Sequence, residues 1–334
     1  MILALETSCD DTSVALVDMT GALLFHRSLS QIPLHAPFGG VVPELASRTH
    51  ALHLPAPVEE CLRETGRTLS DLSACALTIG PGLSGGLLAA IAYLKGVGFG
   101  TRLPLVPVHH VRAHLRVAAN SPDEILPGSL GLVVSGGHTH LYRIDLWPNL
   151  ALLARTTDDA AGEAFDKGAK AMGLPYPGGP EIERLASGYT GRTERLVRAI
   201  HTPAPFDMSF SGLKTAFVAL VGREGSDPEK RPFLAASCQG AIIGHLIDRL
   251  GKSLSHYRPP ALFVGGGVAA NGAFRRALEA LCGDLGVPLR VAPRPLCGDN
   301  AVMVALMGLE LFREGNFCSF PYDEIRPRPR WDED

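Results

Sequence analysis

The chain has 334 residues, enough for two domains of ordinary size, and its 46% apolar content can fill two hydrophobic cores. The formal net charge of −3 argues against a protein that grips nucleic acid alone through a broad basic surface. The seven cysteines lack CxxC pairs, which indicates reduced thiols, and no charged leader or run of ~20 apolar residues stands out. We therefore expect a cytoplasmic protein with no membrane partner.

A three-stranded meander is the first element that the sequence predicts. Apolar residues 2–5 indicate a strand, residues 7–12 a polar turn, and two further strands follow up to Arg27. The turn contains adjacent carboxylates at Asp10 and Asp11. Such carboxylates either stabilise the hairpin itself or contact a substrate directly.

Two predicted strands end in glycine-rich loops that lead into helices. Residues 76–79 run into a loop at 80–86, and residues 261–264 run into a loop at 265–271. Glycine lets the backbone approach a ligand, and the N–H groups at a helix N-terminus favour anions such as phosphate. One such loop is more often an ordinary tight turn, but its recurrence after strands favours a nucleotide.

Two histidines one helical turn apart, His110 and His114, directly follow an apolar strand predicted at residues 103–108. Positions i and i+4 share a helix face, so both imidazoles can reach one cation. The spacing is that of the zinc-protease motif, but Val111 stands where that motif has its catalytic Glu, which disfavours a metallopeptidase. A site of two His and one carboxylate, with open positions for a substrate, remains compatible.

The pattern of the first meander recurs from Leu130. Residues 131–134 indicate a strand, residues 135–138 a turn, and residues 139–145 and 150–155 two further strands. Each meander then gives way to helices that alternate with strands. We therefore expect an α/β protein of two similar lobes, each a mixed βββαβα sheet with helices, facing one another across a nucleotide cleft.

Three familiar classes of nucleotide-binding or hydrolytic protein are disfavoured, because the residues that each class requires are missing from the sequence. Residues 80–85 satisfy GxGxxG, but the acidic residue of a dinucleotide fold is replaced by His109 and His110 about 20 residues on. Residues 82–86 satisfy the GxSxG elbow of α/β-hydrolases, but no His follows His256. The chain contains no Walker A motif, which excludes a P-loop ATPase.

Seven motifs spread over essentially the whole chain resemble those of the TsaD family, the threonylcarbamoyl-transferring enzymes of tRNA modification once described as glycoprotein endopeptidases. They lie at residues 6–12, 80–83, 134–139, 162–167, 177–180, 210–215 and 299–301. The resemblance implies two ribonuclease H-like lobes of the actin, sugar-kinase and Hsp70 ATPase superfamily. The first lobe would span residues 1–112, completed by a C-terminal helix at 300–325, and the second would span 113–299.

The resemblance also implies site residues. One divalent transition metal, Fe2+ with Zn2+ as the alternative, would be held by His110, His114 and Asp299. Apart from the resemblance, we expect Asp10 or Asp11 to accept the proton that the attacking amine of the acceptor loses. The nucleotide would contact nine residues: Val133, Val134, Ser135, Gly136, Gly137, Asp166, Gly179, Glu183 and Asn271.

Some of these residues also have simpler interpretations. Asp299 precedes the apolar run from Ala301 and could cap a helix as well as bind metal. Asp166 is either a solvated helix carboxylate or a contact to a ribose or to metal-bound water. Gly179 suits a turn before a helix, and close approach to a ligand would add to that role.

Four positions depart from the family pattern. Arg112 stands between the two histidines where Glu is usual, and Asp11 also replaces a Glu. Glu183 occupies a position where Asp is common, and His140 replaces a frequent Gln. These changes affect the fine geometry of the site and not the family resemblance.

The resemblance implies transfer of a threonylcarbamoyl group from threonylcarbamoyl-AMP to the exocyclic amine of the adenosine beside the anticodon of tRNA. The implied partners are a degenerate paralogue of the same fold, a P-loop ATPase and the threonylcarbamoyl-AMP synthase. Two alternatives are a metal-dependent carbamoyltransferase acting on a small molecule and a non-catalytic scaffold of a modification complex. A scaffold or a sugar kinase would not need the histidine pair.

Overall fold

The computed structural model describes residues 1–196, 204–225, 227–328 and 330, and it divides into two compact units. Unit 1 contains Met1–Val117 and the segment from Asp299 onward, and unit 2 is Ala118–Gly298. The sequence-based boundary lay five residues earlier and placed Asp299 at the end of the second lobe. Asp299 belongs instead with unit 1, because it directly precedes a helix that packs on the first sheet.

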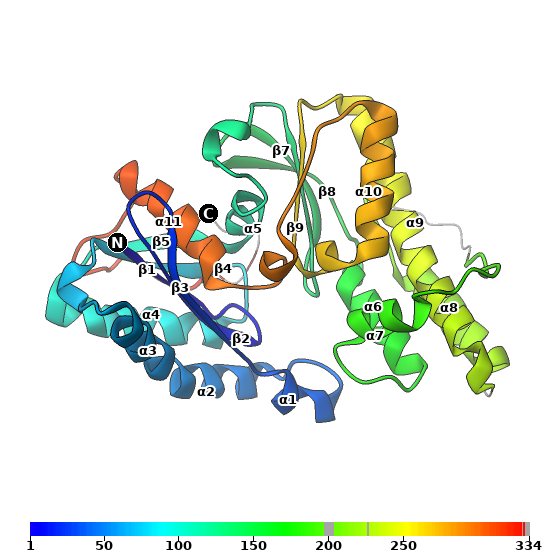
Figure 1. The fold of residues 1–334 in the computed structure, drawn as a ribbon, viewed down its shortest axis with the longest axis horizontal. Helices are drawn as coiled ribbons and strands as arrows, with labels where there is room; N and C mark the ends of the chain where they lie inside the picture. Colours follow the sequence, from blue (N-terminus) through cyan, green and yellow to red (C-terminus); the bar gives the residue numbers. More distant parts are fainter. Residues whose placement is uncertain (197–203, 226, 329, 331–334) are drawn as a thin grey trace. The chain divides into compact units, whose positions relative to one another are not determined.

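The sheet of unit 1 has five strands in the order β3-β2-β1-β4-β5 (Figure 1). The first three strands form the predicted antiparallel meander, and β1, β4 and β5 run parallel. The predicted turn at residues 7–12 is shorter in the structure, because Asp11 already pairs with Ser30 as the first residue of β2. The strands are β1 Ile2–Glu6, β2 Asp11–Val17, β3 Leu23–Ser30, β4 Ala74–Gly80 and β5 Leu105–His109.

Helices cover both faces of this sheet. Leu5, Leu77 and their strand neighbours of the same parity pack with α3 and α4 in one core cluster. Residues of the opposite parity face α11, where a Cβ added to Gly308 would lie 2.4 Å from the Ala76 Cβ, so glycine permits a close helix–sheet approach. The helices of unit 1 are α1 Ile32–His35, α2 Pro43–His53, α3 Pro55–Thr65, α4 Ser84–Thr101, α5 His110–Arg116 and α11 Ala301–Arg313.

The C-terminal helix is shorter than the predicted 300–325. It ends at Arg313, because Gly315 adopts a φ of 81° and donates its N–H to Phe312 O, which turns the chain away. The segment beyond returns to the sheet, where Cys318 bridges Leu105.

The sheet of unit 2 repeats the topology of unit 1, with strand order β10-β9-β6-β7-β8. Strands β6, β7 and β8 form the second antiparallel meander, and β9 and β10 continue the sheet in parallel from β6. The prediction of two βββαβα units is confirmed. The strands are β6 Leu130–Val134, β7 Thr139–Leu146, β8 Asn149–Arg155, β9 Leu262–Gly265 and β10 Leu289–Val291.

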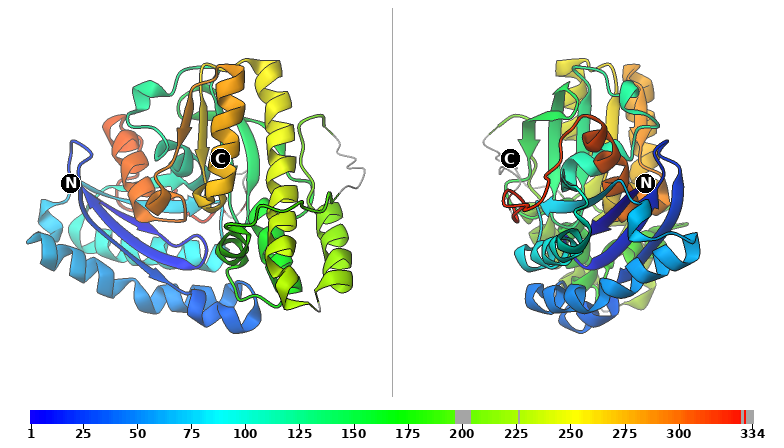
Figure 2. Two further views of the ribbon diagram at one scale, coloured as in Figure 1. Left: turned by 45° about the vertical axis from the view of Figure 1, so that its right-hand side comes forward. Right: turned by 90° about the vertical axis from the view of Figure 1, so that its left-hand side faces the viewer.

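The helices of unit 2 form two groups around the long α9, which packs beside α10 and also contacts α6, α7 and α8 (Figure 2). They are α6 Ala161–Ala171, α7 Gly178–Ala186, α8 Ser211–Glu224, α9 Arg231–Tyr257 and α10 Gly272–Leu285. Within the described residues, no helix is both long and apolar enough to span a membrane. All seven cysteines are free thiols, as predicted.

Candidate metal centre and nucleotide-binding residues

The two histidines of the predicted metal site lie on α5, which begins directly at the end of β5. His110 is the first residue of the helix and His114 lies one turn later, with exposed fractions of 3% and 0%. Their ring centroids are 4.6 Å apart, so both imidazoles occupy one face of α5. The two histidines therefore have the helical spacing predicted from the sequence, and both side chains are buried.

Asp299 meets both imidazoles. Its Oδ1 lies 3.4 Å from His110 Nε2 and 3.1 Å from His114 Nε2. Each of the three residues offers one ligand atom, and these three atoms all lie within 4.8 Å of one another. The capping role considered for Asp299 belongs to its neighbour. Asn300 is the N-cap of α11, and its Oδ1 accepts from Met303 N at 3.0 Å.

Glu6, the last residue of β1, supports the far side of His110 and is completely buried. Its Oε2 lies 3.1 Å from His110 Nδ1 and accepts from Thr78 Oγ1 at 2.6 Å, while its Oε1 accepts from Ser8 N at 2.6 Å. A carboxylate at Nδ1 fixes the ring and directs Nε2 toward Asp299, as in carboxylate–histidine–metal sites. Glu6 was not among the predicted site residues, although a Glu that ends an otherwise apolar strand was an available signal.

The charges of this cluster are strongly coupled. Burial alone would lower the pKa of His110, but attraction to Asp299 and Glu6 raises it to about 10. Burial and the charge on His110 lower the pKa of His114. Burial would raise the pKa of Asp299, but the two histidines hold it well below its usual range. The cluster therefore favours a positive charge at its centre.

The donor set fits a divalent transition metal. Two imidazole nitrogens and one carboxylate oxygen are the ligands that such metals prefer, and the bonds of about 2.0–2.2 Å that they form require ligand atoms a few ångströms apart. The Nε2 and Oδ1 atoms of His110, His114 and Asp299 meet that requirement. The supporting Glu6 and the positive charge that the cluster favours agree with the same interpretation.

The two carboxylates of the first turn are partly buried close to this cluster. Burial, followed by the negative charge of Asp10, raises the pKa of Asp11 to about 7, although a hydrogen bond from Ser30 opposes the rise. The pKa of Asp10 is also raised, chiefly by burial, with Asp299 contributing. A carboxylate that titrates near neutral pH is suited to proton transfer.

The predicted nucleotide residues at the end of β6 form the hairpin that the sequence indicated. Val133 and Val134 are buried in the strand, whereas Gly136 and Gly137 are exposed at its tip. Ser135 O accepts from Gly162 N at 3.1 Å, which joins the hairpin to the first turn of α6.

Two further nucleotide candidates, Asp166 and Glu183, bind helix N-termini of unit 2 through their carboxylates. Asp166 Oδ1 accepts from Gly178 N at 2.7 Å, at the start of α7, where Gly179 also lies. Glu183 Oε1, from α7, accepts from Gly272 N at 2.7 Å, at the start of α10.

The last candidate, Asn271, is the N-cap of α10. Its Oδ1 accepts from Phe274 N at 3.0 Å, and its Nδ2 donates to Gln239 Oε1 at 2.8 Å. Hydrogen bonds therefore join α6 to α7 and α7 to α10, so the candidates on these helices lie close together in unit 2.

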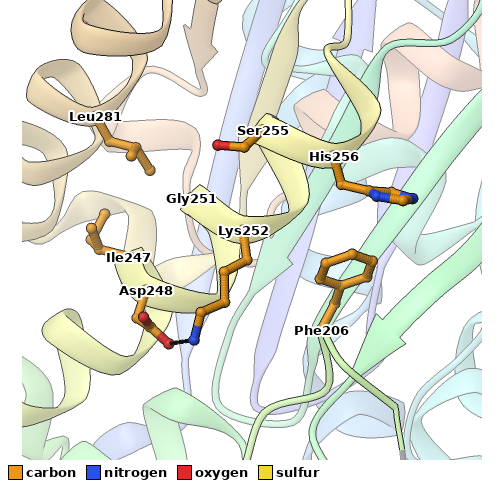
Figure 3. A pocket seen from close by; sticks show the side chains of 8 residues that line it. All are labelled: Phe206, Ile247, Asp248, Gly251, Lys252, Ser255, His256 and Leu281. Carbon is orange, nitrogen blue, oxygen red and sulfur yellow. Dashed lines mark hydrogen bonds and ion pairs between the residues drawn. The ribbon is translucent and has the colours of Figure 1, made fainter.

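An open hollow of about 710 Å³ lies elsewhere in unit 2, beside α9 (Figure 3). Its walls include Phe206 and His256, and its rim carries an ion pair between Asp248 and Lys252 of 2.7 Å. None of the predicted metal or nucleotide residues lines this hollow. It therefore does not coincide with the sites that the sequence predicted.

Comparison with known proteins identifies the family of the chain. Residues 22–306 match the TsaD family, described as tRNA N6-adenosine threonylcarbamoyltransferase. Proteins of that name from Geobacter sulfurreducens and Pelobacter propionicus are 44% and 40% identical to the chain. The first alignment covers 92% of this chain and 91% of the relative, and the second covers 97% and 95%.

A solved structure shares the fold. The activator of 2-hydroxyisocaproyl-CoA dehydratase from Clostridium difficile, with bound ADPNP, superposes with a TM-score of 0.54 at 12% identity. The superposition covers 94% of this chain and 95% of the activator. At that identity the likeness concerns the architecture alone, whereas the sequence matches extend over nearly the full length. The chain belongs to the TsaD family of tRNA N6-adenosine threonylcarbamoyltransferases.

Proposed function

We propose that the chain transfers a threonylcarbamoyl group from threonylcarbamoyl-AMP to the exocyclic amine of the adenosine beside the anticodon in tRNA. The observation that carries this proposal is the family match over nearly the full length, joined to the buried His110, His114 and Asp299 cluster. No observation favours a small-molecule acceptor or a non-catalytic scaffold. A tRNA acceptor also agrees with the cytoplasmic location expected from the sequence.

The donor is a mixed anhydride and is already activated, so the enzyme needs no covalent nucleophile. The adenosine amine attacks the carbamoyl carbon, the bond from that carbon to the phosphate oxygen breaks, and AMP leaves with the electron pair. The amine must also lose one proton. We assign that proton to Asp11 or Asp10, because burial brings the pKa of Asp11 to about 7.

His110, His114 and Asp299 would hold one divalent transition metal, for which we propose Fe2+ with Zn2+ as the alternative. When bound, it would supply Lewis-acid polarisation of the donor carbonyl. Glu6 fixes the orientation of His110 through Nδ1, which keeps the ligand atoms in place before the cation arrives.

The AMP part of the donor is assigned to unit 2. The exposed tip at Gly136 and Gly137 lets backbone N–H groups approach phosphate, and the helix N-terminus near Gly179 favours an anion. We assign Asp166 and Glu183 to ribose contacts. The ADPNP that occupies the dehydratase activator supports a nucleotide site in this architecture.

Asn271→Ala tests the nucleotide assignment. It removes the Phe274 cap and the Gln239 bond of α10, and we expect it to weaken AMP binding by about 1–3 kcal/mol, as for one or two lost hydrogen bonds. Titration calorimetry with AMP measures the change. Equal affinity of variant and wild type would contradict the assignment.

We propose that the chain works with helper proteins: a same-fold paralogue, a P-loop ATPase and the synthase that makes the donor. Its net charge of −3 provides little long-range attraction for a polyanion. The test of function is reconstitution of the metal-loaded chain with donor, unmodified tRNA and the helpers, followed by mass analysis of tRNA nucleosides.

We expect threonylcarbamoyladenosine in that assay and none with the His110→Ala variant. A parallel arm offers free nucleosides and small amines in place of tRNA. Product in that arm and none on tRNA would overturn the proposal in favour of the small-molecule alternative. Full multiple-turnover activity on tRNA without any helper would overturn the partner proposal alone.

A further inference from the structure

The turn at residues 8–10 is held in place through its three carbonyl groups, each bound to a different element. The first carbonyl accepts from Leu83 N at 2.7 Å, the second from His50 Nε2 at 3.0 Å and the third from Gln31 N at 2.9 Å. Two of these donors are backbone amides, which most side-chain substitutions would leave in place. The donor to the middle carbonyl is a side chain, so the turn depends on the identity of residue 50.

The imidazole of His50, on α2, binds the turn and the strand that follows it. Because the Cys9 carbonyl can only accept, Nε2 carries the ring proton, and Nδ1 is left as an acceptor. Nδ1 accepts from Thr12 Oγ1 at 2.8 Å, just after the turn, and from Gln31 Nε2 at 3.2 Å, beyond β3. Contacts at both nitrogens fix the ring and its tautomer.

The ring is completely buried, where apolar side chains are the rule. A polar side chain at such a position destabilises the fold unless its hydrogen bonds are satisfied, as they are at His50. Gly86 of α4 makes the close packing possible, since a Cβ there would lie 2.3 Å from Thr7 O and 3.2 Å from His50 Cδ2. Burial lowers the pKa of His50, which keeps the ring neutral.

The turn that His50 holds carries the proposed proton acceptors. It presents Asp10 and leads directly into Asp11, and Ser8 Oγ lies 3.2 Å from Nδ1 of the metal ligand His110. A shift of the turn would therefore move both carboxylates relative to the metal ligands.

We propose that His50 is a positioning residue for the transfer reaction: through the Cys9 carbonyl it holds Asp10 and Asp11 in their working orientation without touching the substrate. The inference rests on the proposed function. It adds to the reaction a residue of α2 that lies 60 positions before His110, the first proposed metal ligand. His50 is not part of any of the seven motifs that predicted the site.

Two substitutions of similar polarity separate positioning from simple packing. The amide nitrogen of His50→Gln can occupy the place of Nε2 and donate to Cys9 O, whereas the shorter His50→Asn cannot reach it. His53→Asn is the matched control, because His53 lies on the same helix and its Nδ1 makes no hydrogen bond. Steady-state kinetics of the reconstituted transfer reaction, metal content and thermal unfolding are measured for each.

We expect His50→Asn to lower kcat by roughly 100-fold, as for a misplacement of about 1 Å, with the KM for the donor changed less than about threefold. His50→Gln should retain kcat within about fivefold of wild type, and His53→Asn should match wild type. Metal content should stay the same in all three, because the metal ligands are unchanged.

Thr12→Val is the second variant, for use if His50→Asn does not fold. It is nearly isosteric and removes only the hydroxyl that binds Nδ1, so we expect about a tenfold loss of kcat. Wild-type kcat in both His50→Asn and Thr12→Val, or equal losses in the Asn and Gln variants, would overturn the inference. Absence of product with the wild-type chain would instead overturn the proposed function.

Discussion

A buried ion pair joins the helix that carries two of the proposed metal ligands to the helix that follows the third. Arg116 ends α5, two residues after His114, and its Nε contacts Oε1 of Glu310 on α11, the helix that follows Asp299. The exposed fractions of the two side chains are 7% and 9%, so water screens the pair little. We therefore expect it to set the position of α5 against α11, and we test it with Arg116→Met, Glu310→Met and the double variant.

The expected loss of unfolding free energy follows from the burial of the two side chains. Breaking a buried ion pair by removing one partner destabilises a protein by about 3–5 kcal/mol. The double variant replaces the pair by apolar side chains of similar volume, and its free energy of unfolding should lie within about 2 kcal/mol of the wild-type value. The two single losses sum to about 6–10 kcal/mol, so the coupling energy should be at least about 4 kcal/mol.

Urea unfolding of the four proteins measures this cycle, with circular dichroism as the probe. Metal content is the second readout, because displacement of α5 should lower the metal occupancy of the single variants and leave the double variant close to wild type. Single losses that add up in the double variant, with a coupling below about 0.5 kcal/mol, would refute the reasoning.

Three further predictions concern the metal, a glycine and a carboxylate. His114→Ala should abolish metal binding with the fold intact, which metal analysis and circular dichroism check; unchanged metal stoichiometry would contradict the assignment. Gly266→Ala should destabilise unit 2 by at least about 2 kcal/mol, because φ is +94° and a Cβ would lie 2.3 Å from Val134 O, whereas Gly267→Ala should be nearly neutral. The pKa of Asp11 is raised to about 7 in the folded, metal-free protein, so the folded state holds its proton more tightly than the unfolded state and loses stability as pH rises from about 4 to about 7. Asp11→Asn should therefore raise the melting temperature at pH 8 and leave it unchanged at pH 4; an equal shift at both pH values would count against the raised pKa.

Local pattern was sufficient to predict the architecture. Each meander contains its own alternating strands and polar turn within about 30 residues, and each glycine loop lies next to the strand that it follows. The repeat of that pattern from Leu130 predicted the second sheet, and the structure gives the two sheets the same strand order. The spacing of His110 and His114 likewise fixed a shared helix face, because it depends only on α-helical periodicity.

Contacts between distant segments were beyond such pattern reasoning. Glu6 and His110 are 104 residues apart, and only the parallel pairing of β1, β4 and β5 brings them together. The end of α11 was misjudged because Gly315 acts through a positive φ that the apolar pattern does not reveal. Whether Asp299 or Asn300 caps α11 was equally undecidable, since both side chains are good caps and the backbone decides.

The hydrogen bonds that Asp166, Glu183 and Asn271 already make within the protein determine whether each could also bind the nucleotide directly. Asp166 and Glu183 each accept a helix N-terminal N–H through one oxygen, and a carboxylate has two oxygens with several acceptor positions. Capping and ribose binding are therefore compatible for Glu183, since a ribose hydroxyl can donate to its second oxygen. Asn271 differs, because Phe274 N binds its oxygen and its nitrogen donates to Gln239. We infer that Asn271 serves the nucleotide chiefly by fixing the start of α10, whereas Glu183 can contact the ribose directly.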